Sequence, residues 1–166
     1  MIANEPQVMH VVVPGTFDPV TLGHVDVILR ARRLFPRVTV AVAASVNKRG
    51  SGPTFSEALS AEDIHDVAVK PFSGLLVDFC HEEGAGAVVK GLRAMTDFEY
   101  ELQQADLNCH LSPDIESVFV MSNPKYGYVS SSIVREIASM GSSVETLVPR
   151  NVNERLRERF GQGAQK

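Results

Sequence analysis

The fold of this chain is decided by one stretch, Gly15-Thr16-Phe17-Asp18-Pro19-Val20-Thr21-Leu22-Gly23-His24. Residues 9–13 before it are apolar and predict a buried strand, and the apolar residues after it share one face of a helix. Free N–H groups and the helix dipole make such a strand–helix junction an anion site. We expect Gly15 and Gly23 to let a phosphate approach the backbone, and we expect His24 to face it from the first helical turn.

Length and composition indicate a single domain, residues 1–166, with flexible ends at 1–8 and 161–166. A hydrophobic content of 44% is typical of a globular protein, and a net charge of −4 does not predict a general nucleic-acid surface. With no signal peptide and no apolar run of membrane length, we expect a cytoplasmic protein. Cys80 and Cys109 lack metal-ligand spacing, so structural thiols and no dedicated metal site are expected.

Strand-like and helix-like segments alternate along the chain. Strands are expected at residues 9–13, 38–44, 66–69, 87–89 and 118–121. Helices are expected at residues 22–35, 75–83 and 151–160, and two more begin near residues 96 and 130. The helix from 96 has one apolar stripe of Phe98, Leu102, Ala105 and Cys109. The helix from about 130 has one apolar stripe of Ile133, Ile137 and Met140. Ser73, Thr96 and Asn151 are the expected N-caps. This alternation predicts an α/β fold with a doubly wound five-stranded parallel sheet.

Ligands of such sheets bind beyond the carboxyl ends of the strands. Four marked segments fall there, at residues 15–24, 45–49, 90–93 and 126–132. Lys90 and Arg93 could clamp anionic groups, and Lys48 could close over a ligand. Taken alone, each segment is equally typical of a solvated turn, a surface lysine or a plain N-cap. The convergence of all four on one crevice favours a phosphate site.

Thr21-Leu22-Gly23-His24 is a variant of the His-x-Gly-His signature of nucleotidyltransferases, with Thr21 in place of the first histidine. Three further blocks follow in order: Ser45 with Lys48, Lys90-Gly91-Leu92-Arg93 with Asp97-Phe98-Glu99-Tyr100-Glu101, and residues 126–132 with Val134. Over nearly its whole length, the chain resembles the phosphopantetheine adenylyltransferases.

The resemblance implies adenylyl transfer from ATP to 4′-phosphopantetheine, giving dephospho-coenzyme A and pyrophosphate, with Mg²⁺ arriving on ATP and a homohexameric assembly. It implies catalytic roles for His24, Lys48 and Arg93. Phosphopantetheine would contact Thr16, Lys48, Leu76 and Lys90, the last standing where many members have arginine. ATP would contact Thr16, Phe17, His24, Gly91, Leu92, Arg93, Glu101, Tyr126, Gly127, Tyr128, Val129, Ser130, Ser131 and Ser132.

One segment departs from the family pattern. The stretch between Phe55 and Ser73 is shorter than the resemblance implies, and its hydrophobic content is thin. We expect a short or broken helix near residues 57–64, with weak order or a chain break near 55–57.

Two other functions stay open on the sequence alone. The chain could be another small-molecule nucleotidyltransferase, acting on nicotinamide mononucleotide or with CTP, although the run from Lys90 to Glu101 speaks against both. It could also be a catalytically silent nucleotide-binding sensor, although His24 and Lys48 are both retained.

Overall fold

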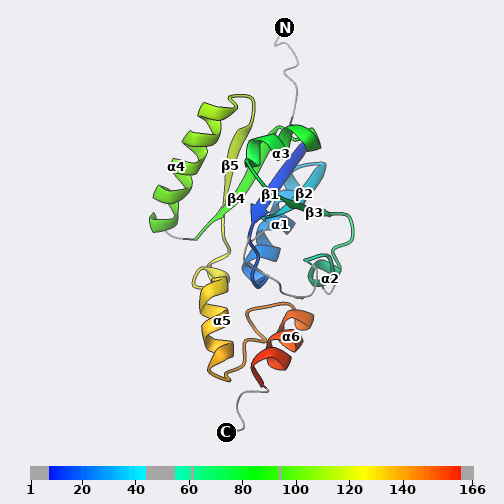
Figure 1. Cartoon of the computed structure of the whole chain (residues 1–166), viewed down its shortest axis with the longest axis vertical. Coiled ribbons are helices and arrows are strands. Elements are labelled where there is room, and N and C mark those ends of the chain that lie inside the picture. Colours follow the sequence, from blue (N-terminus) through cyan, green and yellow to red (C-terminus); the bar gives the residue numbers. More distant parts are fainter. Residues whose placement is uncertain (1–7, 44–54, 61, 94, 162–166) are drawn as a thin grey trace.

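The computed structural model describes residues 8–43, 55–60, 62–93 and 95–161. Its sheet has five parallel strands in the order β3-β2-β1-β4-β5, with β1 at the centre, which confirms the predicted fold class (Figure 1). The strands are β1 (His10–Gly15), β2 (Arg37–Ala43), β3 (Ala68–Phe72), β4 (Ala87–Leu92) and β5 (Glu116–Met121). The inner strands are apolar along most of their length because helices cover both faces of the sheet.

Six α-helices and one 3₁₀ helix accompany the sheet within the described ranges. They are α1 (Leu22–Leu34), α2 (Phe55–Ser60), α3 (Leu76–Glu83), α4 (Met95–Leu111), η1 (Pro124–Tyr126), α5 (Ser131–Ser139) and α6 (Arg150–Gly161). None of the helices in these ranges is long and apolar enough to cross a membrane.

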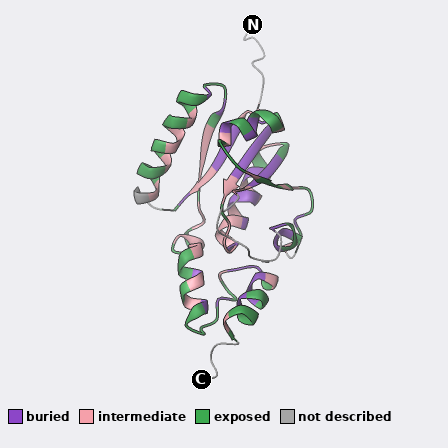
Figure 2. Cartoon of the chain, viewed as in Figure 1, coloured by how far each residue is buried: buried purple, intermediate pink, exposed green. Residues whose placement is uncertain are grey.

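Side chains alternate between the two faces of the sheet, so the chain has two cores. Val11 and Val13 belong to the larger core, which includes side chains of α1 and α2 and continues past the carboxyl ends of the strands to α5 and α6. Val12 and Val88 belong to the smaller core, under α3. Figure 2 shows the buried strands between these layers and the exposed outer faces of α4, α5 and α6.

Several predicted boundaries are wrong by a few residues. β3 begins at Ala68 rather than at residue 66. Leu75 is the N-cap of α3 and makes no side-chain capping bond, so Ser73 does not cap this helix. Gly84 ends the helix in the left-handed conformation (φ 66°). Thr96 and Asn151 lie inside α4 and α6 rather than before them.

The short helix expected between Phe55 and Ser73 is present as α2, but its bounds differ. It spans six residues and begins at Phe55, so the expected break near residues 55–57 is wrong. Asp63 adopts a positive φ of 57°, and the N–H of Ile64 donates to the carbonyl of Leu59. A helix cannot continue through that turn. Phe55, Leu59 and Ile64 are nevertheless buried in the larger core.

The apolar stripes predicted on α4 and α5 are largely at the surface. On α4, Phe98, Leu102 and Cys109 are exposed, and on α5, Ile133 and Met140 are exposed. The reason is rotation about the helix axis. α4 turns Glu101, Gln104, Ala105 and Asn108 toward the sheet, and α5 buries Val134 and Ala138. Cys80 is buried as a structural thiol, and burial raises its pKa to about 11.

Candidate active site

Three of the four segments expected at the crevice are linked by hydrogen bonds beyond the carboxyl ends of the strands. Arg93, after β4, donates from Nη1 to the carbonyl of Val129 at 2.8 Å. Ser131, at the start of α5, donates from Oγ to the carbonyl of Pro19 at 2.8 Å. The fourth segment, residues 45–49 with Lys48, lies outside the described residues.

The β1–α1 turn is shaped by Phe17. This residue has a positive φ of 48°, the following Asp18–Pro19 peptide is cis, and the ring folds back over Gly15. A Cβ on Gly15 would lie 2.8 Å from that ring. The ring also meets the His24 imidazole edge-on, with centroids 5.0 Å apart. The glycine therefore makes room for Phe17, a packing role that the sequence did not predict.

Gly91 is likewise required for packing, and Gly23 lies beside Tyr126. A Cβ on Gly91 would lie 2.5 Å from Cγ2 of Val27, so β4 approaches α1 too closely for a side chain. A Cβ on Gly23 would touch Tyr126 at 3.5 Å. These contacts hold α1 against the strands and loops that carry the other site residues.

The start of α1 fixes the orientation of His24. Thr21 is the N-cap, and its Oγ1 accepts from the backbone N–H of His24 at 3.3 Å. In return, the backbone N–H of Thr21 donates to Nδ1 of His24 at 3.0 Å, which completes a capping box. Because Nδ1 accepts a hydrogen bond, the ring hydrogen of the neutral imidazole is on Nε2. His24 thus offers an Nε2–H donor.

The charge state of His24 follows from its surroundings. Burial lowers its pKa to about 4, and the positive charge of Arg93 acts in the same direction. The imidazole is therefore neutral at pH 7. With Nδ1 occupied and Nε2 protonated, the ring can donate a hydrogen bond to an oxyanion but cannot accept a proton at Nε2.

Arg93 is held in place on two sides. Its Nε and Nη2 donate to the two carboxylate oxygens of Asp97 at 3.0 and 3.3 Å, and Nη1 donates to Val129. Among the described residues, three of its five N–H donors are occupied in this way. Asp97 belongs to the sequence block that resembles the family. Its spacing from Arg93 did not by itself predict that the two side chains bond to each other.

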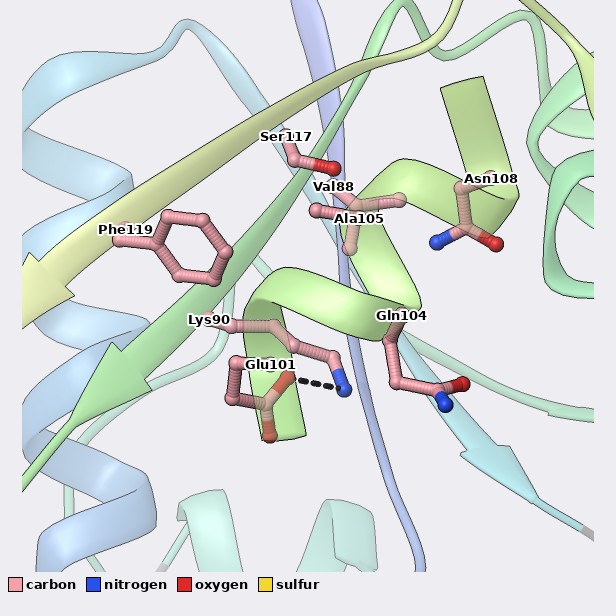
Figure 3. A pocket seen from close by; sticks show the side chains of 8 residues that line it. All are labelled: Val88, Lys90, Glu101, Gln104, Ala105, Asn108, Ser117 and Phe119. Atoms are coloured by element: carbon pink, nitrogen blue, oxygen red, sulfur yellow. Dashed lines mark ion pairs between the residues drawn. The ribbon is translucent and has the colours of Figure 1, made fainter. Parts of the chain in front are cut away.

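Lys90 and Glu101 form an ion pair, with Nζ 2.9 Å from Oε2 (Figure 3). Both side chains are largely buried beside a cavity of about 10 Å³ between α4 and strands β4 and β5, which Gln104, Asn108 and Ser117 also line. The sequence placed these two residues in the same crevice but did not predict that they pair. A phosphate that binds Lys90 has to displace or share the carboxylate.

The three serines at the start of α5 are each engaged. Ser130 is the N-cap and accepts from the N–H of Ile133 at 3.2 Å. Ser131 bonds to Pro19, and Ser132 accepts from Nη2 of Arg135 at 3.4 Å. Arg135 also donates from Nη1 to the carbonyl of Asp18, a contact that no pattern in the sequence predicts.

The other expected site residues differ in exposure. Thr16 and Tyr128 are exposed, Leu92 is buried, and Tyr126, Gly127 and Leu76 are half-buried, Leu76 lying in the first turn of α3 against the smaller core. Within the described residues, no cluster of three or more His, Cys, Asp or Glu side chains could hold a metal ion.

Comparison with known proteins gives two kinds of match. The family model described as cytidylyltransferase-like matches residues 12–137. The chain is 50% identical to the phosphopantetheine adenylyltransferase of Thiobacillus denitrificans over 89% of this chain and 97% of that one. It is 47% identical to the enzyme of that name from Thermobifida fusca, over 94% and 97%, and 41% identical to that from Staphylococcus carnosus, over 90% and 96%.

Solved structures match at lower sequence identity. A structure described as a putative nicotinate-nucleotide adenylyltransferase from Vibrio parahaemolyticus superposes with a TM-score of 0.65 at 14% identity, covering 92% of this chain and 93% of that one. A bifunctional NMN adenylyltransferase/ADP ribose pyrophosphatase from Francisella tularensis gives 0.70 at 14% identity, over 93% and 50%. At this identity the likeness shows the fold alone.

We expect the His24 ring to remain neutral, with its proton on Nε2, from pH 7 down to about pH 4. Nitrogen-15 NMR titration measures this, and the resonance missing from a His24→Gln variant assigns the signal. Because the folded-state pKa lies below the ordinary 6.5, the unfolded chain binds this proton first as the pH falls. Folding stability from this group is present above pH 6.5 and is lost toward pH 4. A midpoint near 6.5, or a proton on Nδ1, would contradict the expectation.

Proposed function

This chain belongs to the phosphopantetheine adenylyltransferase family, and from that premise we propose that the crevice around His24 and Arg93 transfers the adenylyl group of ATP to 4′-phosphopantetheine. The products are dephospho-coenzyme A and pyrophosphate. The observation that carries the proposal is the identity of 41–50% to enzymes of that name over about nine-tenths of each chain.

The chemistry of this transfer suits a site without a general base. The nucleophile is a phosphate oxygen of phosphopantetheine, which is already anionic at neutral pH. It forms a bond to the α-phosphorus of ATP while the bond from that phosphorus to the bridging oxygen breaks, and the electron pair leaves with pyrophosphate. Catalysis then depends on positioning the two substrates and on stabilising the charge of the transferring group.

His24 and Arg93 are the described residues that we assign to this stabilisation. The Nε2–H of His24 would donate to an oxygen on the α-phosphorus, and its neutral state at pH 7 supports a donor role. Arg93 keeps a fixed guanidinium, and the N–H donors not engaged by Asp97 and Val129 would bind phosphate oxygens. Lys48 would act as a third group, and it lies outside the described residues.

The substrate contacts follow the family pattern. For phosphopantetheine we propose Thr16, Lys48, Leu76 and Lys90. For ATP we propose Thr16, Phe17, His24, Gly91, Leu92, Arg93, Glu101 and residues 126–132. The packing of Gly91 against Val27 supports a passive role for Gly91, since the missing side chain lets the end of β4, which leads to Arg93, approach α1.

Mg²⁺ would enter as part of the ATP complex, held by phosphate oxygens and water, which are the ligands this ion prefers. We place the reaction in the cytoplasm, where ATP is available as the adenylyl donor.

A homohexamer completes the proposal. Exposed apolar side chains lie on both flanks of α4: Phe98 and Leu102 on one, and Tyr100, Leu107 and Leu111 on the other. Between these flanks the outward side carries Glu99, Gln103, Asp106 and His110. Several large apolar side chains exposed along one helix are typical of an interface. Light scattering coupled to size-exclusion chromatography is expected to give six times the chain mass, and a monomer would contradict this assembly.

Substrate choice tests the proposal directly. The protein is expected to release pyrophosphate from ATP in the presence of phosphopantetheine, and far less when nicotinamide mononucleotide replaces it or CTP replaces ATP. A coupled pyrophosphate assay with each pair measures this. Equal turnover with nicotinamide mononucleotide would overturn the assignment, and binding of ATP without any turnover would favour a nucleotide sensor.

Substitution of His24 separates its role in the chemical step from its role in capping α1. His24→Ala is expected to lower kcat by roughly 10²–10³, as for loss of a transition-state hydrogen-bond donor, with much smaller changes in KM. His24→Gln is the matched control, because a glutamine at this helix position can still accept from the N–H of Thr21. It should keep the melting temperature near that of the parent and still lose kcat, because its flexible amide N–H is not held where the imidazole holds the Nε2–H. Near-normal kcat in both variants would remove His24 from the mechanism.

A further inference from the structure

We propose that Asp26 is a positioning residue for the nucleotide end of the crevice. It would act by fixing the connection between β5 and α5 to helix α1. This inference rests on the proposed function, since residues 126–132 of that connection are the ones assigned to ATP. Asp26 lies two residues after His24 on α1, and its side chain is largely buried, with 18% exposed.

The carboxylate of Asp26 has two partners. Its Oδ2 accepts from the backbone N–H of Asn123 at 3.2 Å and from Nε of Arg30 at 2.9 Å. Arg30 is one helical turn away on α1 itself, so that contact does not reach outside the helix. The bond to Asn123 joins α1 to a segment 97 residues further along the chain.

Asn123 is the point at which the chain leaves the sheet. The N–H of Ser122 still donates to the carbonyl of Leu92 at 2.8 Å, in continuation of the β4–β5 pairing. The next backbone N–H, that of Asn123, lies past the end of the β4–β5 pairing and donates to Asp26 instead. A charged acceptor makes this a stronger bond than one to a carbonyl.

After Asn123, the chain forms turns that are bonded mainly to themselves. The side chain of Asn123 accepts from the N–H of Lys125 at 3.0 Å, its carbonyl accepts from Tyr126 at 2.8 Å, and Val129 donates to the carbonyl of Tyr126 at 3.0 Å. These bonds define the shape of residues 123–129 but not their place relative to α1. Asp26 fixes the beginning of this segment, and Arg93 holds its end at Val129.

The position of Tyr126 shows why the placement of residues 123–129 relative to α1 matters. A Cβ on Gly23 would touch Tyr126 at 3.5 Å, so the segment lies against the first turn of α1, next to His24. Without the Asp26 carboxylate, the N–H of Asn123 loses its anchor to α1, and the packing of Tyr126 against the larger core is left to hold the segment beside this turn. The geometry therefore assigns to Asp26 an effect on ATP and not on phosphopantetheine, because the described residues proposed to bind phosphopantetheine, Thr16, Leu76 and Lys90, lie outside residues 123–129.

The experiment compares three variants in steady-state kinetics with each substrate varied in turn. Asp26→Ala is expected to raise KM for ATP about tenfold, while KM for phosphopantetheine stays within about twofold of the parent. Arg30→Ala removes only the partner within the helix, and Asp26→Asn keeps an oxygen acceptor for Asn123. Both of these variants should stay within about twofold to threefold of the parent for ATP. A purely structural role for Asp26 would not separate the two substrates.

Three results would overturn the proposal: an unchanged KM for ATP in Asp26→Ala, equal increases for both substrates, or an Arg30→Ala variant as impaired as Asp26→Ala. Should Asp26→Ala fail to fold, hydrogen exchange on the parent protein still decides. The Asn123 amide must be as protected as that of Ser122, and a freely exchanging Asn123 amide contradicts the bond. If the parent protein shows no turnover, that result counts against the proposed function. The exchange result then decides whether Asp26 holds Asn123.

Discussion

The reciprocal hydrogen bonds between Thr21 and His24 are the constraint on which the rest of the site depends. They begin α1 directly beyond the carboxyl end of the central strand, and the same bonds leave the imidazole with its hydrogen on Nε2. The residue expected to touch the transferring phosphate is therefore also the residue that caps the helix. Its orientation and its charge state are set before any ligand binds, because Nδ1 is occupied and burial together with Arg93 keeps the ring neutral.

The loops around this helix start are fixed mainly by one another. Arg93 bonds to Val129, Ser131 bonds to Pro19, and Asp26 bonds to Asn123, so segments after β1, β4 and β5 share contacts beyond the strand ends. A parallel sheet places these segments side by side but does not specify their distances. Side chains that span two loops supply that information. Positioning of this kind is what a transfer between two phosphates requires.

The sequence predicted the architecture well because the apolar strand runs and the strand–helix alternation are strong local signals. β1, α1 and the N-cap at Ser130 lie close to where their patterns placed them. The exposed faces of α4 and α5 could not be predicted, since periodicity shows that a stripe is apolar but not what covers it. The packing role of Gly15 could not be predicted either, because the Phe17 ring folds back over it only in the completed turn. The Lys90–Glu101 pair and the Asp26–Asn123 bond depend on tertiary distance, for which no spacing rule exists.

The two ends of the crevice consequently differ in how they can receive a ligand. At the His24 end, the side chains of His24 and Arg93 are already held by partners that a phosphate does not have to displace. Ligand binding there therefore costs little free energy of reorganisation. At the Lys90 end, the ammonium is already neutralised by Glu101 at 2.9 Å in a largely buried setting. A phosphate arriving at Lys90 gains a charge partner only to the extent that it replaces the carboxylate. We therefore expect discrimination between phosphate-bearing substrates to be stronger at this end, because only a ligand that also satisfies the released Glu101 avoids leaving a buried charge without a partner.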